Sequence, residues 1–220
     1  IGINASNFPD PNFRAYVKAK FDKNNDNFLS ESERNAVTSI DLHNGYNGQK
    51  LVSLDGIEHF PNLTTLICYN NQLTSLDVSK NTKLKRLNCK NNQLTNLNVE
   101  NTNIDPTPWL FSGLYAPGNA YSIAVGSDRA FDLSNLPGKF DVTKATRWNG
   151  GTVRGNTLTV KAGATKVTYL YDCGKRSSYT FTLNVTVVPE GSIGINASNF
   201  PDPNFRAYVK AKFDKDNDNF

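Results

Sequence analysis

The sequence has 220 residues, of which 38% are hydrophobic and 20% charged, and its net charge is +4. These values are ordinary for a globular protein of one or two domains, and the charge is too small to predict nucleic-acid binding. No apolar run reaches the roughly 18 residues of a membrane span, three cysteines do not make a disulfide framework, and the absence of methionine predicts a piece of a longer precursor.

The first predicted element is a helix that begins at Pro11, with Asp10 as its N-cap. The apolar side chains that share one face at helical spacing are Phe13, Tyr16, Val17 and Phe21. We expect this face to cover the open end of a repeat, since terminal repeats need a cap. Self-cleavage at the Asp10-Pro11 bond is an alternative use of these residues, but the helix cap already explains both.

The loop after this helix fits the EF-hand template for calcium. Its oxygen ligands, in template order, are Asp22, Asn24, Asp26, the Phe28 carbonyl, Ser30 and a bidentate Glu33. Asn27 replaces the template glycine, and asparagine tolerates the left-handed backbone needed there. Ser30 and Glu33 also form a capping box that requires no metal, but a cap alone leaves the earlier ligands unexplained. We predict one Ca2+ site with a structural role, because a single hand has no partner hand to open.

The clearest pattern is a repeat that is written twice. Residues 63–78 recur as residues 84–99, each position 21 residues later, with the motif Leu-x-x-Leu-x-Cys-x-x-Asn-x-Leu-x-x-Leu-x-Val. Such a period is typical of a solenoid, in which stacked coils bury a common core. A degenerate coil precedes it at residues 37–57, and Cys68 and Cys89 are predicted to fill the core as small buried hydrophobes.

The outward side chains of the repeat strands are predicted to form a small concave strip. They are Thr65, Ile67, Tyr69, Arg86, Asn88 and Lys90. An aromatic ring and two cations suit an acidic glycan or a protein loop, although a solvated sheet face has the same residue types. The area of the strip is well below the roughly 800 Å2 that each partner buries in a standard interface. One module is therefore expected to bind weakly, and an array of modules to gain affinity by avidity. His43 and His59 have no ligand partners at suitable spacing and are predicted to lie at the surface or an edge.

From about Tyr115 the sequence changes to short alternating strands. The expected strands are residues 121–125, 152–160, 167–171 and 179–187, with turns at residues 149–151 and 155–156. This pattern favours a β-sandwich over residues 113–190. Residues 109–111 are expected to close the core of the repeats before it.

Residues 193–220 repeat residues 1–28 with one difference, Asn24 against Asp216. We interpret residues 191–220 as the truncated start of a second tandem module. The first three calcium ligands recur there, but the sequence holds no counterparts of Ser30 and Glu33, so no second tight site is predicted. Another molecule can supply the missing oxygens by head-to-tail association through residues 193–220.

The repeat motif resembles the leucine-rich repeats of bacterial internalin-like surface proteins over about a third of the chain. With the patterns above, the resemblance implies a mixed, mainly β fold. An EF-hand-like or dockerin-like helix-loop-helix (residues 1–36) is expected to cap a short leucine-rich-repeat solenoid (residues 37–112). An immunoglobulin-like β-sandwich (residues 113–190) is expected to follow.

The sequence shows no nucleophile elbow, no phosphate-binding glycine loop and no paired carboxylates outside the calcium loop. We therefore expect a non-catalytic, calcium-stabilised adhesion or recognition module of a secreted or cell-surface bacterial protein. Its expected partner is a host or bacterial surface protein or glycan. The competing interpretations are a structural stalk in a tandem array and an accessory module of a larger glycan-degrading enzyme.

Overall fold

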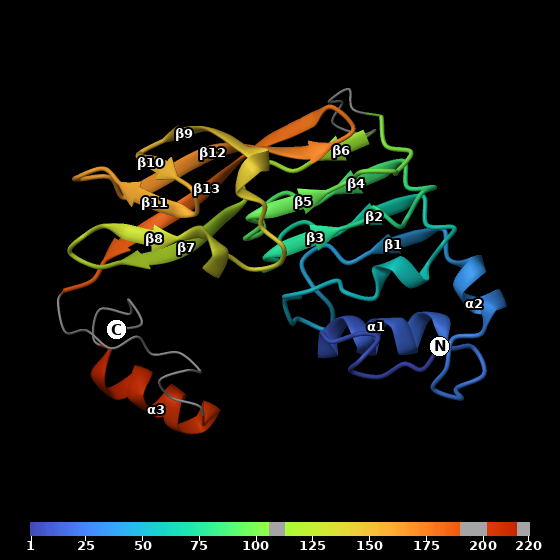
Figure 1. Cartoon of the computed structure of the whole chain (residues 1–220). Helices are drawn as coiled ribbons and strands as arrows, with labels where there is room; N and C mark the ends of the chain where they lie inside the picture. The colour runs from blue at the N-terminus through green and yellow to red at the C-terminus, as the bar shows by residue number, and fades with distance from the viewer. Residues whose placement is uncertain (106–112, 190–201, 215–220) are drawn as a thin grey trace.

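The computed structural model describes residues 1–105, 113–189 and 202–214 (Figure 1). The mainly β fold is confirmed, because short parallel strands follow two N-terminal helices, and mostly antiparallel strands follow these. Residues 109–111, expected to close the repeat core, and the acidic positions 216 and 218 lie outside the described residues. None of the helices within the described ranges is long and apolar enough to cross a membrane.

The N-terminal helices are α1 (Pro11–Phe21) and α2 (Glu31–Ala36). The Asp10 carboxylate caps α1 by accepting two backbone N–H groups of its first turn, at 2.8 and 2.9 Å, as the Asp-Pro pair predicts. The predicted apolar face is buried at Phe13, Tyr16 and Val17 and partly buried at Phe21. It packs on the first coil, where the Tyr16 ring meets the Tyr46 ring edge-on at 5.3 Å.

Two parallel sheets form the repeat region, which we define as residues 37–105 and 113–119. The first sheet contains, in spatial order, β1 (Ser39–Asp41), β2 (Thr65–Ile67), β4 (Arg86–Asn88) and β6 (Gly113–Tyr115). The second contains β3 (Ser75–Asp77) and β5 (Asn96–Asn98), and a 3-10 turn, η1 (Ile57–His59), lies between β1 and β2 in the chain. Thr65 pairs with Arg86 and Ser75 with Asn96, each 21 residues later. The sequence period therefore corresponds to one coil with two strands.

The strand pairing extends the repeat region beyond residue 112. β6 pairs in parallel with β4 and places Gly113 opposite Arg86, while Leu114 and Ala116 are buried at the inward positions. The repeat region therefore ends later in the chain than the predicted boundary at residue 113. The connection from β4 to β6 is longer than the 21-residue period, so the sequence pattern does not show this last coil.

The C-terminal β region, residues 120–189, contains two further sheets. The first consists, in spatial order, of β7 (Ala120–Val125), β13 (Ser177–Val187), β12 (Lys166–Gly174) and β9 (Ala145–Asn149). The second consists of β10 (Gly151–Arg154), β11 (Thr157–Val160) and β8 (Ala130–Asp132), and the 3-10 turns are η2 (Leu133–Asn135) and η3 (Val142–Lys144). Residues 152–160 thus form a hairpin around the predicted turn, and β8 and β9 were not predicted. The last described element is α3 (Pro203–Phe213).

The repeat region and the C-terminal β region share one hydrophobic core. The buried Tyr169 of β12 donates its hydroxyl to the carbonyl of Thr95 at 2.7 Å. The Val99 amide donates to the carbonyl of Cys173 at 2.9 Å. These contacts join the two regions into one packed body.

We expect Tyr169→Phe to lower the free energy of unfolding by about 1–3 kcal/mol, because it keeps the ring but leaves the buried carbonyl of Thr95 without this donor. Urea denaturation measures the change. Tyr121→Phe, which alters a partly exposed ring in β7, is the control and is expected to change stability by about 0.5 kcal/mol or less. Equal effects of the two substitutions would argue against a special role for the Tyr169 hydrogen bond.

Candidate functional site

The predicted calcium loop connects α1 to α2 and is folded by its own polar groups. The buried Asp22 carboxylate accepts the backbone N–H groups of Asp26 and Asn27, both at 3.1 Å. Asn25 and Asn27 have left-handed backbones, with φ of 58° and 64°, as an asparagine in place of the template glycine allows. These contacts curl the loop around the first predicted ligand.

Glu33, the last predicted ligand, uses both carboxylate oxygens within the loop. Its Oε1 accepts the Lys23 N–H at 2.7 Å, and its Oε2 accepts the Ser30 N–H at 2.8 Å and hydroxyl at 2.7 Å. Ser30 accepts the Glu33 N–H in return, so the predicted capping box is confirmed. The Ser30 hydroxyl, followed by the Lys23 amide, lowers the pKa of Glu33, which keeps its carboxylate ionised. A cation held by Glu33 would therefore share these oxygens with the loop's own donors or displace one of them.

The N-terminal residues pair with the end of this loop. Ile1 and Leu29 exchange two backbone hydrogen bonds, at 2.8 and 2.7 Å, and Ile3 donates to the carbonyl of Asn27 at 2.8 Å. The remaining predicted ligands, Asn24, Asp26 and Phe28, lie in the exposed part of the loop. Within the described ranges, no group of three or more His, Cys, Asp or Glu side chains gathers to hold a metal. Calcium binding by the loop therefore stays a prediction.

The residues predicted to bind a ligand lie on one exposed side of the first parallel sheet. We call this surface the sheet face, and its predicted members, all partly exposed, are Thr65, Ile67, Tyr69, Arg86, Asn88 and Lys90. The register places Thr65 beside Arg86 and Ile67 beside Asn88. The alternating residues of the same strands, Leu66 and Leu87, are fully buried. The period-two alternation thus brings the predicted residues together.

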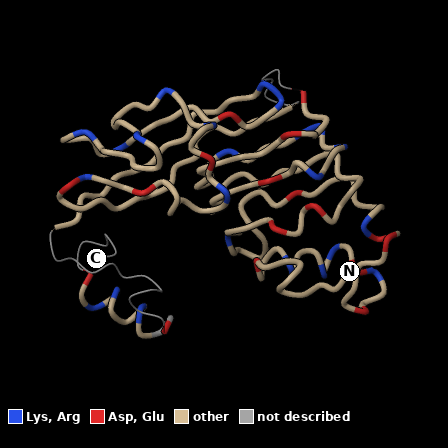
Figure 2. Tube along the Cα trace, in the orientation of Figure 1, with Lys and Arg blue, Asp and Glu red and all other residues tan. Residues whose placement is uncertain are grey.

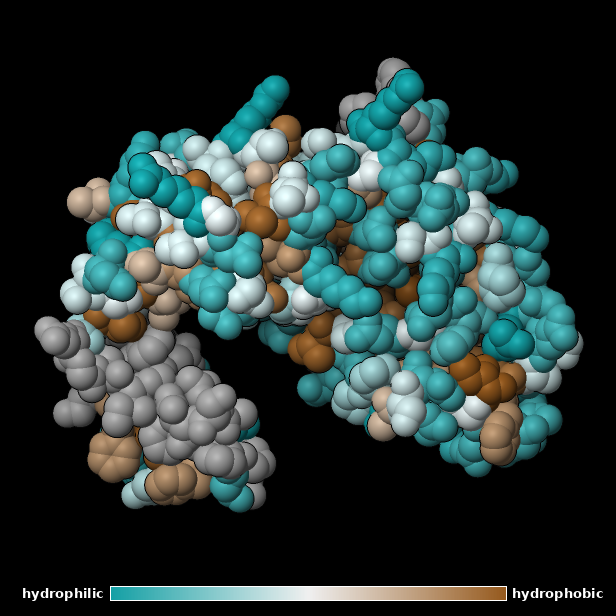
Figure 3. Space-filling view, viewed as in Figure 1, coloured by the Kyte–Doolittle hydropathy of each residue, from teal (hydrophilic) through white to brown (hydrophobic). Residues whose placement is uncertain are grey.

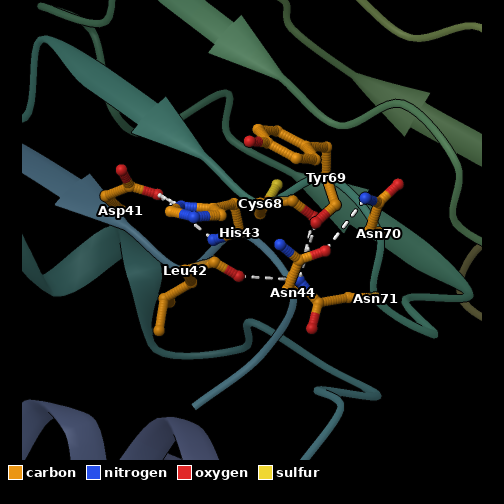
Figure 4. Close-up of polar contacts among 8 residues, drawn as sticks. All are labelled: Asp41, Leu42, His43, Asn44, Cys68, Tyr69, Asn70 and Asn71. Carbon is orange, nitrogen blue, oxygen red and sulfur yellow. Dashed lines mark hydrogen bonds and ion pairs between the residues drawn. The ribbon is translucent and has the colours of Figure 1, made fainter. Parts of the chain in front are cut away.

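His43 and Tyr115 also lie on the sheet face, although the sequence did not assign them to it. The His43 ring stacks on the Tyr69 ring, with centroids 5.3 Å apart, and its Nδ1 lies 2.7 Å from Oδ1 of Asp41 (Figure 4). The Lys90 ammonium lies 5.1 Å from the centre of the Tyr69 ring and 5.9 Å from that of Tyr115. His43 lies two residues after β1, as Tyr69 lies two residues after β2. This equivalence is hard to see in the sequence, because the first coil is longer than 21 residues.

A column of buried asparagines holds the turns beneath the sheet face. Asn92 donates its amide to the carbonyls of Cys89 and Cys68, at 3.1 and 3.0 Å, and accepts the Leu73 N–H at 3.1 Å. Asn71 makes the equivalent contacts one coil earlier, including a 2.8 Å bond to the Leu42 carbonyl (Figure 4). Asn119 makes them one coil later. Each side chain therefore ties two coils together.

A second asparagine column lies at the surface beside the first. The Asn91 amide donates to Asn70 at 2.8 Å, and the Asn70 amide donates to Asn44 at 2.9 Å. All three have left-handed backbones, with φ between 53° and 62°, which asparagine adopts more readily than most residues. The next coil has Gly118 at this position, where an added Cβ would lie 2.3 Å from the Asn91 side chain. The turn at the edge of the sheet face is therefore the same in successive coils.

The three cysteines are free and buried. Burial raises the pKa of Cys68 and Cys89 well above the ordinary value, and that of Cys173 to about 12. These thiols therefore stay protonated near neutral pH, where a protonated thiol is a poor nucleophile and metal ligand. Core filling, as predicted for the two repeat cysteines, accounts for their positions.

Two grooves lie apart from the sheet face. A groove of about 660 Å3 opens between the end of α1 and α2, and its lining includes Lys20 and Glu33. Another, of about 490 Å3, lies between the second parallel sheet and the C-terminal β region, with Asp77, Lys80 and Lys139 among its lining residues. Figure 2 shows that charges of both signs are spread along the chain. Both grooves accordingly have mixed charge.

No protein-family model matches the chain. A segment of 75 residues, 34% of the chain, is 42% identical to internalin J from Listeria monocytogenes serotype 4b (strain F2365). This segment is similar to internalin J. The match spans only 8% of that protein's length.

Two solved structures are similar to the chain. One is the functional domain of InlJ from Listeria monocytogenes, which includes a cysteine ladder; the TM-score is 0.46 and the identity 22%, over 73% of this chain and 36% of that one. The other is the structure of CBM51-2 in complex with GlcNAc and INT domains from Clostridium perfringens ZmpB. Here the TM-score is 0.40 and the identity 16%, over 81% of this chain and 35% of that one.

Proposed function

We propose that the chain is a non-catalytic recognition module of a secreted or cell-surface bacterial protein, and that it binds a glycan or protein through the sheet face. In this proposal the repeat region is a leucine-rich-repeat solenoid, and the C-terminal β region is an immunoglobulin-like sandwich. The observation that carries the proposal is the position of the Lys90 ammonium between the rings of Tyr69 and Tyr115. The similarity of one segment to internalin J supports the repeat fold and the surface location.

The chemistry of the sheet face favours a ligand that bears a carboxylate. The electron-rich faces of the two tyrosine rings attract the Lys90 ammonium and restrict its position. Arg86 lies on the strand that precedes Lys90, and a guanidinium binds a carboxylate through two parallel hydrogen bonds. The stacked His43 and Tyr69 rings offer a flat surface beside these cations. An acidic glycan combines a carboxylate with a sugar ring that can lie on such a surface.

The calcium loop has a structural role in this proposal. Asp22, Asn24, Asp26, the Phe28 carbonyl, Ser30 and Glu33 are oxygen donors in the order that Ca2+ requires. The left-handed backbones at Asn25 and Asn27 support the tight turn of the template. Because the loop lies between α1 and α2, a cation there would hold the cap on the first coil and leave the sheet face open.

Sialyllactose is a suitable first probe, with neutral lactose as its matched ligand. We expect weak binding of sialyllactose to the chain, and a loss of about tenfold or more in affinity for Arg86→Ala, Lys90→Ala and Tyr69→Ala, since each contact to a charged group contributes about 1.5–3 kcal/mol. Binding is measured by NMR titration of the protein amides. Lys161→Ala removes an equal charge at an exposed position of the C-terminal β region and should leave the affinity unchanged.

The alternatives predict different outcomes. A stalk should bind neither ligand, and its behaviour should not depend on the sheet face. An accessory module of a glycan-degrading enzyme should also bind lactose or another neutral sugar, and it requires a catalytic domain in the full-length protein. Binding of sialyllactose that persists in Arg86→Ala and Lys90→Ala would show that the sheet face is not the site.

A further inference from the structure

The chain contains the same helix twice in two different environments. α3 (Pro203–Phe213) has the same eleven residues as α1, PNFRAYVKAKF, and each helix follows an aspartate N-cap. Asp202 accepts the Phe205 N–H at 2.7 Å, as Asp10 accepts the Phe13 N–H at 2.9 Å. The two segments therefore fold alike locally, and a surface that fits one of them fits the other.

In the first copy, this surface is the repeat end, which we define by Tyr46, Val52, Ser53 and Phe60. The Tyr16 ring meets Tyr46 edge-on, and the Phe21 ring meets Phe60, both with centroids 5.3 Å apart. The second oxygen of the Asp10 carboxylate accepts the backbone N–H groups of Val52 and Ser53, at 2.7 and 3.2 Å. α1 thus covers the repeat end by apolar contacts and by hydrogen bonds.

In the second copy, the matching side chains are exposed. Tyr208, the counterpart of Tyr16, is 52% exposed, whereas Tyr16 is 8% exposed. Phe213, the counterpart of the partly buried Phe21, is 67% exposed. Figure 3 shows hydrophobic atoms at the surface of the segment labelled α3 in Figure 1. Exposed aromatic side chains gathered on one helix mark a surface that associates.

We propose that α3 docks on the repeat end of a second copy of this chain, in the place of that copy's α1. The exchange conserves the ring contacts of Tyr46 and Phe60, because the incoming helix has the residues of the outgoing one. Exchange of identical elements is a low-cost route to association. The tethered α1 competes at an effective concentration of about 1 mM, so the intact chain is mainly monomeric at micromolar concentration and associates as its own concentration nears that value.

The test compares Tyr16→Ala, Tyr208→Ala and the double variant by light scattering during gel filtration. Tyr16→Ala weakens docking of α1 about 100-fold and leaves α3 intact, so it is expected to form dimers and longer head-to-tail species at tens of micromolar. The Tyr16→Ala/Tyr208→Ala variant is expected to stay monomeric, because neither helix then fits the repeat end well. Tyr208→Ala alone should behave like the unmodified chain at micromolar concentration.

A second measurement does not depend on the folding of the Tyr16 variant. Sedimentation velocity of the unmodified chain, carried to about 1 mM, should show association that Tyr208→Ala abolishes. This substitution removes a ring that is 52% exposed and whose ring contacts, to Phe205 and Phe213, lie within α3. Association that persists without Tyr208 would overturn the proposal, as would a monomeric unmodified chain at that concentration. A monomeric, fully folded Tyr16→Ala variant would overturn it as well.

Discussion

Replacement of Asn92 by alanine is expected to lower the free energy of unfolding by about 3–5 kcal/mol. The Asn92 amide bonds to four backbone groups, namely the carbonyls of Cys68, Cys89 and, at 3.4 Å, Lys90, and the N–H of Leu73. The side chain is buried, so water cannot replace it without opening the coil, and each unsatisfied buried group costs about 1–3 kcal/mol. For a chain of this size we expect the melting temperature to fall by about 10 °C or more.

The adjacent Asn91 provides the control. Asn91→Gly removes an exposed side chain that makes one bond to Asn70, and glycine keeps the left-handed backbone without strain. We expect a loss of about 1 kcal/mol or less. Thermal and urea denaturation of both variants measure the difference. Similar losses for Asn92→Ala and Asn91→Gly would mean that the buried column has no larger part than the exposed one in joining the coils.

The two asparagine columns show how far a repeat can be predicted from its sequence. Asn71 and Asn92 occupy the same position of the 21-residue motif, so the period relates them. Asn119 makes the same contacts, but its coil is longer and replaces the motif cysteine by Ala116, so no pattern identified it. A coil of the repeat region is defined by its hydrogen bonds to the neighbouring coils, and these bonds tolerate insertions that destroy the sequence period.

Only part of the sheet face was predicted, again because coils of unequal length break the sequence period. Its six predicted residues follow from strict alternation in two strands of equal spacing. His43 and Tyr115 belong to coils of other lengths, so their positions beside Tyr69 and Lys90 became visible only with the strand pairing. The missed strands β8 and β9 have another cause. They are short or rich in polar residues, and the pairing partner decides such strands more than their own propensity does.

The duplicated helix shows what sequence cannot decide. α1 and α3 have the same residues and the same kind of cap, so their local structure was predictable from either copy. Their burial differs because it depends on whether a coil end lies against the apolar face. Secondary structure is therefore set within these eleven residues, and their packing is set by the rest of the assembly.

Calcium is expected to raise the melting temperature of the chain, and Glu33→Gln is expected to abolish this effect. A ligand that binds only the folded state stabilises it in proportion to the logarithm of its concentration over Kd. For 1 mM Ca2+ at a site with a Kd of about 10 μM, the melting temperature should rise by about 5–10 °C relative to a chelator. Differential scanning calorimetry in calcium and in chelator measures this rise.

The substitution separates the two roles of Glu33. Glutamine keeps the capping box, because its one acceptor oxygen can take the Ser30 N–H. It cannot also accept the Lys23 N–H, which is exposed and can bond to water instead, so in chelator Glu33→Gln should melt only slightly below the unmodified chain. It lacks the bidentate carboxylate that Ca2+ requires at the last template position, so the rise in calcium should disappear. Glu31→Gln removes an equal charge from the exposed first turn of α2 and should keep the rise. If calcium leaves the melting temperature of the unmodified chain unchanged, Ser30 and Glu33 are a helix cap alone, and the carboxylates that precede them order the loop by their hydrogen bonds to its backbone.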